Sequence, residues 1–314
     1  MNSIKLFFAT DLHGSEKCFK KFIGAYRTYK ADVMVIGGDL TGKAIIPFVV
    51  KKNGSIMVDY FGQKLSISSE TQERRYYDEE ADYGYYPYKI NEEAYDDFMH
   101  DEKAITKAFL DSMKERLEKW IRLVETQLKG VNVIINAGND DPMELDSILD
   151  SSDAIIHPEG KVIDVNGYEM ISTGYANMTP WHAPRDITEE ALREKIEAMA
   201  TNLKAPEKSI FNIHPPPFNS GLDLAPKIDQ WFRPVTTSGI PVMEAVGSMA
   251  VREMLEKYQP MLGLHGHVHE SRAAKMLNST LIINPGSDYQ YGILHGALIK
   301  IDNGRVINYM LTTG

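Results

Sequence analysis

The sequence predicts an α/β protein with a layered core and a mixed β-sheet. Short apolar runs, many of them β-branched, alternate with amphipathic stretches along most of the 314 residues, as buried strands alternate with helices in α/β proteins. Near the C-terminus, strand-like runs follow one another closely, separated by Asn278-Ser279 and Asn303-Gly304, which is typical of antiparallel hairpins. A sheet with antiparallel as well as parallel strands is therefore expected.

The predicted strands are brief runs bounded by Gly, Pro or polar residues, and the predicted helices carry apolar side chains at helical spacing. The strands cover residues 5–9, 32–36, 131–136, 154–156, 168–172, 209–213, 261–264, 272–276, 280–283, 297–301 and 305–310. The helices cover residues 17–29, 101–129, 189–203 and 242–258. Within the last pattern, Gly247-Ser248 marks the start of a helix.

Residues 44–100 differ from the rest of the chain in charge and in aromatic content. They hold 11 acidic and 6 basic residues and 8 of the 16 tyrosines. Two apolar runs, 48–50 and 56–58, flank a turn-like segment as in a hairpin, and 63–67 adds a third strand-like run. We expect one domain over residues 1–314 with an acidic, tyrosine-rich surface insertion at about 44–100. The alternative is a lid or a partner surface, including a homodimer contact, because tyrosines supply rigid contact area.

Charge and cysteine content count against several classes of protein. Lys plus Arg number 34 against 44 Asp plus Glu, and this net charge of −10 is unsuited to general binding of nucleic acid or of an anionic membrane. The single cysteine excludes an internal disulfide and a Cys-based zinc site. No apolar run approaches the roughly 18 residues of a membrane span, and the N-terminal run is too short for a signal peptide. We therefore expect a soluble, cytoplasmic protein.

Residue types that bind metals follow five of the predicted strands. They are Asp11 and His13, then Asp39, then Asn139, then His214, and finally His267 and His269. Because ligand sites in α/β sheets lie beyond the carboxyl ends of strands, these side chains are expected to converge on one crevice. In an extended segment, residues two apart face the same way, so both members of each closely spaced pair would point into it.

This set of two aspartates, four histidines and one asparagine predicts a binuclear metal centre. Oxygen and imidazole ligands without thiolate suit Mn²⁺, Fe or Zn²⁺. Seven ligands are too many for one transition metal with an open position, but they fit two metals bridged by a carboxylate and a solvent oxygen. Such a pair, ~3.5–4 Å apart, supplies a bridging hydroxide for attack at phosphorus. The expected chemistry is therefore hydrolysis of a phosphate ester.

The five blocks resemble, in the same order, the signature of the calcineurin-like metallophosphoesterases. Three further stretches are similar to the Icc-related bacterial and archaeal branch of that family; they are 173–180, 214–217 and 284–287 with 296–299. The resemblance covers nearly all of the chain outside 44–100. It implies a four-layer αββα sandwich of two mixed sheets, with the metals at the strand ends.

The resemblance also implies a role for each ligand. Asp11, His13 and His269 would hold the first metal, Asp39 would bridge, and Asn139, His214 and His267 would hold the second. The expected metals are Mn²⁺ or an Fe/Mn pair, with Zn²⁺ as an alternative. Asn139, His265 and Arg185 are the candidates for contact with the substrate phosphate, the last because its fork binds phosphate in a bidentate manner.

The chain departs from the family pattern at Asp140, where many members have a histidine near the leaving group. A carboxyl group serves as a general acid only when its pKa is raised, and nearby dications lower it. Asp140 is therefore expected to be a loop residue beside the metal ligands, with a catalytic role in proton transfer as the alternative, and a site without that histidine favours esters with good leaving groups. This points to a phosphodiesterase rather than a phosphatase.

We therefore expect a metal-dependent hydrolase that acts on a small phosphate ester, with phosphodiesters favoured. A phosphomonoesterase or a nucleotide-pyrophosphate hydrolase is the alternative within the enzymes. A non-catalytic interaction module on the same fold is the alternative from another class. Family members that have lost catalysis tend to have lost ligands, and here all seven are present, which favours the enzyme.

Overall fold

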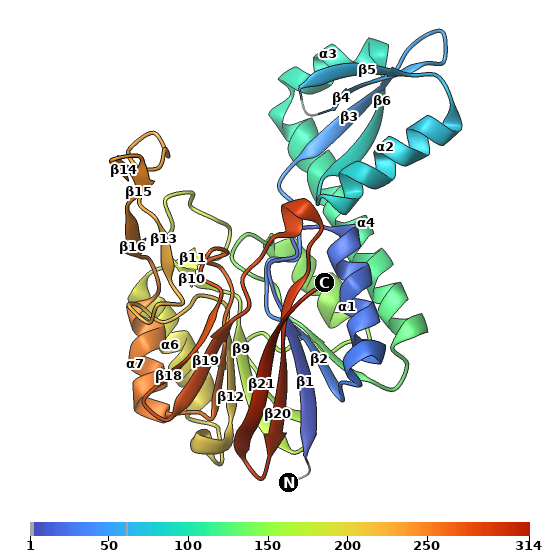
Figure 1. The fold of residues 1–314 in the computed structure, drawn as a ribbon. Coiled ribbons are helices and arrows are strands. Elements are labelled where there is room, and N and C mark those ends of the chain that lie inside the picture. Colours follow the sequence, from blue (N-terminus) through green and yellow to red (C-terminus); the bar gives the residue numbers. More distant parts are fainter. Residues whose placement is uncertain (1–2, 61) are drawn as a thin grey trace.

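Two mixed β-sheets pack face to face in the computed structural model, and helices cover both outer faces (Figure 1). The structure describes residues 3–60 and 62–314. Apolar side chains of both sheets form one buried cluster between them, and a further cluster lies under the helices on each side. The four-layer αββα sandwich expected from the sequence is confirmed.

The first sheet has the strand order β21-β20-β1-β2-β7. Its strands are Arg305–Thr313 (β21), His295–Asp302 (β20), Ile4–Ala9 (β1), Val33–Ile36 (β2) and Asn132–Ile135 (β7). β1, β2 and β7 are parallel, so their carboxyl ends lie at one edge. The antiparallel hairpin predicted at the C-terminus is present as β20 and β21.

The second sheet has the order β18-β19-β17-β12-β9-β8. Its strands are Ala273–Leu277 (β18), Thr280–Asn284 (β19), Leu262–Leu264 (β17), Ile210–Ile213 (β12), Tyr168–Thr173 (β9) and Val162–Val165 (β8). The four inner strands are parallel, and each edge strand is antiparallel to its neighbour. The mixed pairing predicted from the sequence is thus found in both sheets.

Alternating side chains of the strands join the layers. In β1, Leu6 and Phe8 enter the core between the sheets, whereas Phe7 and Ala9 face the helices. The first sheet is covered by α1 (Glu16–Tyr29) and α4 (Glu102–Gln127), and the second by α6 (Glu189–Ala200) and α7 (Met249–Tyr258). α7 begins after Ser248, whose Oγ accepts a hydrogen bond from the Val251 N–H at 3.1 Å.

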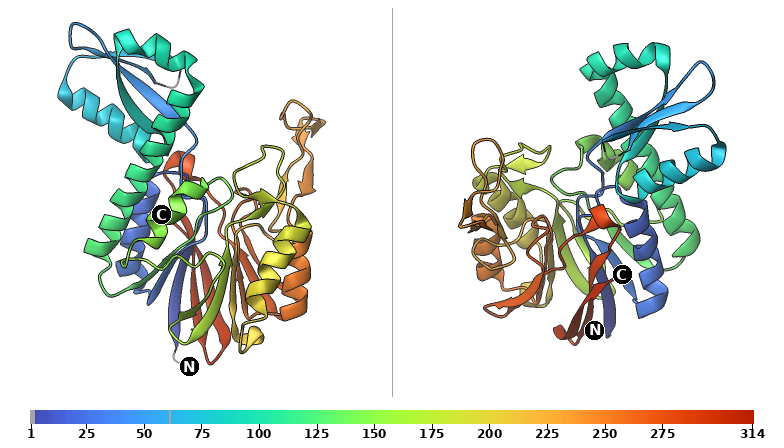
Figure 2. Two further views of the ribbon diagram at one scale, coloured as in Figure 1. Left: turned by 180° about the vertical axis from the view of Figure 1, so that it is seen from behind. Right: turned by 45° about the horizontal axis from the view of Figure 1, so that its top comes forward.

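The insertion forms a lobe beside the strand-end edge of the sandwich (Figure 2). Its sheet has the order β5-β4-β3-β6, with the strands Gln63–Ile67 (β5), Ile56–Tyr60 (β4), Ile45–Val50 (β3) and Tyr86–Asn91 (β6). The three predicted strands are confirmed, whereas β6 and the helices α2 (Glu70–Asp82) and α3 (Glu92–His100) are not foreseen by the sequence analysis. β6 pairs with β3 in parallel, and its place at the edge of the sheet tolerates Pro87.

Shorter elements connect these parts. They are η1 (Met143–Leu145), α5 (Asp146–Asp150), β10 (Ala176–Asn177), β11 (Asp186–Ile187), η2 (Pro206–Lys208), β13 (Leu224–Pro226), β14 (Thr236–Thr237), β15 (Ile240–Pro241), β16 (Met243–Ala245) and η3 (Tyr289–Tyr291). The strands β13 to β16 build an arm that projects from the second sheet (Figure 1). The pairing of β16 with β13 shortens the helix expected at 242–258, and the strand expected at 154–156 is only an isolated bridge from Ile156 to Ile134.

Among the described residues, no helix has both the length and the apolar character needed to cross a bilayer.

The contact between Trp120 and Phe19 fixes α4 to the sandwich and predicts a stability effect. Trp120 is 1% exposed, and its ring stacks on Phe19 with the ring centroids 4.2 Å apart. We expect Trp120→Ala to lower the free energy of unfolding by about 3–5 kcal/mol, measured by urea denaturation. Trp120→Phe is the matched control: it should cost much less, because the indole N–H makes no hydrogen bond. Equal losses in the two variants would contradict this account.

Candidate metal centre

The predicted metal ligands lie together where five strands end. Asp11 and His13 follow β1, Asp39 follows β2 and Asn139 follows β7 in the first sheet, while His214 follows β12 and His267 and His269 follow β17 in the second. Most of these side chains are buried, and His267 and His269 are partly exposed. The site therefore lies across the junction of the two sheets, as the strand-end pattern predicts.

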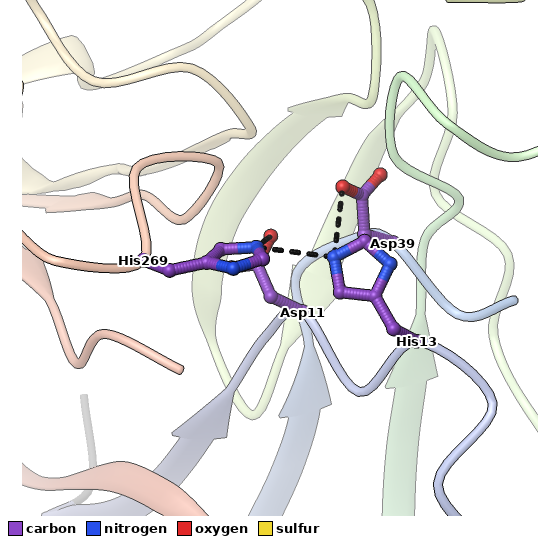
Figure 3. A group of neighbouring side chains, drawn as sticks. All are labelled: Asp11, His13, Asp39 and His269. Atoms are coloured by element: carbon purple, nitrogen blue, oxygen red, sulfur yellow. Dashed lines mark hydrogen bonds and ion pairs between the residues drawn. The ribbon is translucent and has the colours of Figure 1, made fainter. Parts of the chain in front are cut away.

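Four of the ligands form a tight group (Figure 3). Asp11, His13, Asp39 and His269 each offer a ligand atom, and these atoms all lie within 4.8 Å of one another. The Nε2 atoms of His13 and His269 face each other at 3.1 Å. His269 Nε2 is also 3.5 Å from Asp11 Oδ1. Two imidazole nitrogens at this distance require a proton or a cation between them, and a divalent cation fits this donor set.

The carboxylate of Asp39 connects this group to the remaining ligands. Its Oδ2 lies 3.5 Å from His13 Nε2, and its Oδ1 lies 3.4 Å from His214 Nε2. The other two ligands continue from His214: the ring of His267 lies 5.4 Å from that of His214, and His267 Nδ1 is 2.9 Å from Asn139 Oδ1. Asp39 thus turns one oxygen toward each half of the set, as a bridging carboxylate would.

Hydrogen bonds behind the ligands orient their rings toward the site. Nδ1 of His13 donates to the Thr41 carbonyl at 3.3 Å, and Nδ1 of His214 donates to the Gly37 carbonyl at 3.2 Å, so each Nε2 faces the other ligands. Nε2 of His214 is buried and lies 3.4 Å from Asp39 Oδ1 and 3.8 Å from Asp11 Oδ1. A buried nitrogen aimed at two carboxylates suits a metal ligand once its proton has left.

The backbone at the site adopts conformations that most residues avoid. Asp11, His13, Asp39 and His267 all have positive φ, between 41° and 67°. Residues in this region cost roughly 1–3 kcal/mol each and cluster at functional sites. Gly38, at φ 138°, precedes Asp39, and a side chain there would collide with the ring of His214. These strained backbone conformations bring the donor atoms of the ligands together.

The pKa shifts describe how the ligands are charged without metal. Burial raises the pKa of Asp11, but a hydrogen bond from His269 and the charges of His269 and His214 outweigh it and lower the pKa to about 2. Burial lowers the pKa of His13 to about 3 and that of His267 to about 4. Burial also opposes charge on His214, but Asp39 and Asp11 raise its pKa to about 9. Ionised carboxylates, two neutral imidazoles and a protonated His214 therefore coexist at neutral pH.

A cavity adjoins the metal ligands, and two of the candidates for phosphate contact do not line it. Arg185 is fully buried, and its guanidinium donates to Asp146 Oδ1 at 2.6 Å and to the carbonyl oxygens of Asp141 and Pro142. Its fork therefore holds the segment after Asn139 rather than a phosphate. His265 is buried too, and its Nδ1 donates to the Ile213 carbonyl at 2.8 Å. Both side chains support the strand ends from behind.

Asp140 lies at the cavity and is paired with a residue that the sequence analysis did not select. Its carboxylate is 2.9 Å from Lys43 Nζ, and its backbone N–H donates to Asp39 Oδ1 at 3.1 Å. Burial and the charge of Asp39 raise the pKa of Asp140 to about 6, against the opposing effect of Lys43. Lys43 lies directly before the insertion and belongs to no sequence motif. Its position at the cavity is therefore known only from the fold.

Two further aspartates order the ligand loops and carry a weak signal in the sequence. Asp141 follows the Asn139 block, and its carboxylate accepts hydrogen bonds from the backbone of Leu40 at 2.9 Å and of Gly138 at 2.7 Å. This ties the loop after β2 to the loop after β7. Asp186 accepts from Asn139 Nδ2 at 3.1 Å, so the amide oxygen of Asn139 faces His267.

The base of the insertion lies directly against His13. The Thr41 carbonyl that orients His13 is followed by Gly42, whose N–H donates to the Tyr86 hydroxyl at 3.0 Å. A side chain at Gly42 would collide with the Gly84 carbonyl, so the two chain crossings into the lobe touch each other. From η3, the ring of Tyr289 packs 4.6 Å from that of His13. The lobe and the ligand therefore share one packed contact.

Sequence comparisons find one relative for part of the chain. No protein-family model matches it. Over 158 residues it is 28% identical to an uncharacterized protein of Methanocaldococcus jannaschii, which covers 49% of this chain. The match spans 64% of the length of that relative.

Structural comparisons show the fold. A solved crystal structure superposes with a TM-score of 0.59 at 15% identity, covering 99% of this chain and 98% of the other. Phosphoesterases are among the similar structures. An archaeal phosphodiesterase has a TM-score of 0.40 at 11% identity, covering 99% of this chain and 100% of that chain. The phosphoesterase YfcE of E. coli has a TM-score of 0.35 at 13% identity, covering 98% of each chain.

The raised pKa of His214 predicts that metal binding releases protons. At pH 7 this imidazole is protonated, and a metal takes its lone pair only after the proton leaves. We expect Mn²⁺ binding at pH 7 to release about one proton from His214. His269 should contribute further protons, because the hydrogen bond and charge of Asp11 outweigh burial and raise its pKa as well. Affinity should rise with pH up to about pH 9. Calorimetry in buffers of different ionisation enthalpy counts the protons released. The His214→Gln variant should release fewer protons than the wild type. Metal binding without proton release would contradict the assignment of His214 as a ligand.

Proposed function

We propose that this chain is a metal-dependent phosphoesterase of the calcineurin-like type that hydrolyses phosphodiesters. The observation that carries the proposal is Asp39, whose two carboxylate oxygens face His13 on one side and His214 on the other. A carboxylate placed between two sets of imidazole and carboxylate donors suits two divalent cations. The resemblance of the five sequence blocks supports the same conclusion.

The chain provides the ligands and their orientation. Asp11, His13 and His269 would hold one metal and Asn139, His214 and His267 the other, with Asp39 shared between them. When bound, two divalent cations activate water for attack at phosphorus and stabilise the negative charge that develops there. Mn²⁺ or an Fe/Mn pair suits these oxygen and imidazole donors. The backbone and side-chain hydrogen bonds behind the ligands keep the donor atoms in place during turnover.

Lys43 and Asp140 support a preference for diesters. Among the described residues that line the cavity, Lys43 is the one lysine or arginine, and Asp140 is its partner. A phosphodiester carries one negative charge, which a single lysine balances. A monoester dianion or a pyrophosphate would bring further negative charge close to Asp140 and Asp39. Because Asp140 accepts from Lys43, we assign it to positioning this lysine rather than to protonating the leaving group.

The alternative of a non-catalytic interaction module is less well supported. A scaffold would not need two buried carboxylates facing a buried His214 or four ligands held at positive φ, since both features reduce stability. Selection for stability alone would favour their replacement.

Replacing Asp39 tests the function directly. Asp39→Asn should lower Mn²⁺-dependent hydrolysis of bis(4-nitrophenyl) phosphate by at least about 10²–10³-fold, because the neutral amide cannot bridge two cations. The metal content and the melting temperature should be measured on the same sample, and the exposed Asp153→Asn serves as the control. An unchanged rate in the folded variant would refute the bridging role.

Lys43 should affect substrate binding more than metal binding. We expect Lys43→Ala to lower kcat/KM for the same diester by roughly 10–100-fold, the effect of losing one charge-assisted hydrogen bond, with unchanged metal content. Lys43→Arg should restore part of the activity. Lys52→Ala is the matched control, because Lys52 pairs with Glu93 on the surface of the lobe. A Lys43→Ala enzyme with wild-type kcat/KM would remove this residue from the site.

A further inference from the structure

The cavity beside the ligands is lined by two kinds of side chain. It has a volume of about 690 Å³ and includes the ligands Asp39, Asn139 and His269, together with Lys43 and Asp140. Many of the other lining side chains are apolar, among them Phe109, Met113, Trp181, Pro226, Ile228 and Val246.

The apolar lining comes from three separate parts of the fold. Phe109 and Met113 come from α4, and Trp181 comes from the loop between β10 and β11. Ile228 and Val246 belong to the arm of β13 to β16, which stands on the other side of the strand ends from α4 (Figure 2). Elements distant in sequence thus present apolar side chains to one space that is continuous with the metal ligands.

Trp181 is unusually exposed for its size. It is 67% exposed, and its ring lies 6.2 Å from that of Phe232, which is itself 54% exposed. Covering an exposed tryptophan at the wall of a cavity with an apolar group lowers the free energy, because apolar surface is removed from water. A phosphoryl group at the metal ligands would fill only part of the cavity, which leaves space against this wall for the rest of the substrate.

The charged side chains of the cavity disfavour a second anionic group on the substrate. Lys43, the one lysine or arginine among the described lining residues, is assigned to the phosphate at the ligands, and Glu270 adds a negative charge. Apart from the metal ligands, a further phosphate or carboxylate would meet only one other basic side chain among these lining residues, the imidazole of His182.

We propose that the substrate is a phosphodiester whose non-leaving arm is an uncharged, apolar group seated against Trp181 and Ile228. The inference rests on the proposed phosphodiesterase function and adds the chemistry of the group that the enzyme recognises. Hydrolysis breaks the bond from phosphorus to the other, leaving arm, water supplies the new oxygen, and the apolar arm remains on the phosphate monoester product.

Three diesters with the same leaving group test this inference. Methyl, hexyl and 5-carboxypentyl 4-nitrophenyl phosphate all release 4-nitrophenolate, so they differ only in the arm that stays. We expect the hexyl ester to have a kcat/KM at least roughly tenfold above that of the methyl ester, mainly through a lower KM, because its arm buries apolar surface. The carboxylated arm should lose that advantage.

A variant pair locates the effect. Trp181→Ala should bring the hexyl-to-methyl ratio of kcat/KM close to one. Trp231→Ala is the matched control and should keep the ratio, because Trp231 is equally exposed, at 63%, but stacks with Arg233 and does not line the cavity.

The outcomes separate the two proposals. Hydrolysis of the hexyl and methyl esters with equal kcat/KM overturns the apolar arm and leaves the phosphodiesterase intact. A ratio that Trp181→Ala does not change overturns the assignment of the arm to this wall. Failure to hydrolyse any of the three esters with two metals bound overturns the proposed function, and the inference falls with it.

Discussion

Two carboxylates, Asp11 and Asp39, are buried side by side, and the rest of the site follows from this constraint. In the described part of the chain, their ion pairs are all with histidines. A buried carboxylate costs several kcal/mol unless it is compensated. Protonated imidazoles provide part of this compensation. The nitrogens that bind these protons are the ones that would bind a metal. The negative charge of the two carboxylates is therefore balanced only when the site binds protons or cations.

The arrangement of the sheets allows these charged side chains to lie close together. Parallel strands of both sheets end at one edge, so short loops deliver the ligands without any long excursion of the chain. Asp141 and Asp186 then fix these loops through backbone and amide hydrogen bonds. The large buried core between the sheets supplies stability that offsets the cost of the positive φ angles and of the buried carboxylates.

The sequence predicts the site better than it predicts the lobe, and the reason is physical. Ligand types at strand ends are local features, and the sheet then brings them together by its parallel order. β6 was missed because its pairing with β3 spans a crossover, and its Tyr-Pro-Tyr start is not typical of a strand. Arg185 shows another limit, since the fork that suits a phosphate also suits carbonyl oxygens, and only its burial decides between them. Lys43 reaches the cavity through the fold alone.

Helix α4 has a consequence for how the molecule moves as a whole. Its 26 residues make a rod of about 39 Å, anchored on Phe19 in the sandwich through Trp120 and continuing into the lobe. The same rod carries Phe109 and Met113 in the cavity wall, between these two ends. A tilt of the helix about its anchor would be small at the wall and amplified at the tip of the lobe. Because one continuous helix holds both, the cavity wall and the lobe share the orientation of α4.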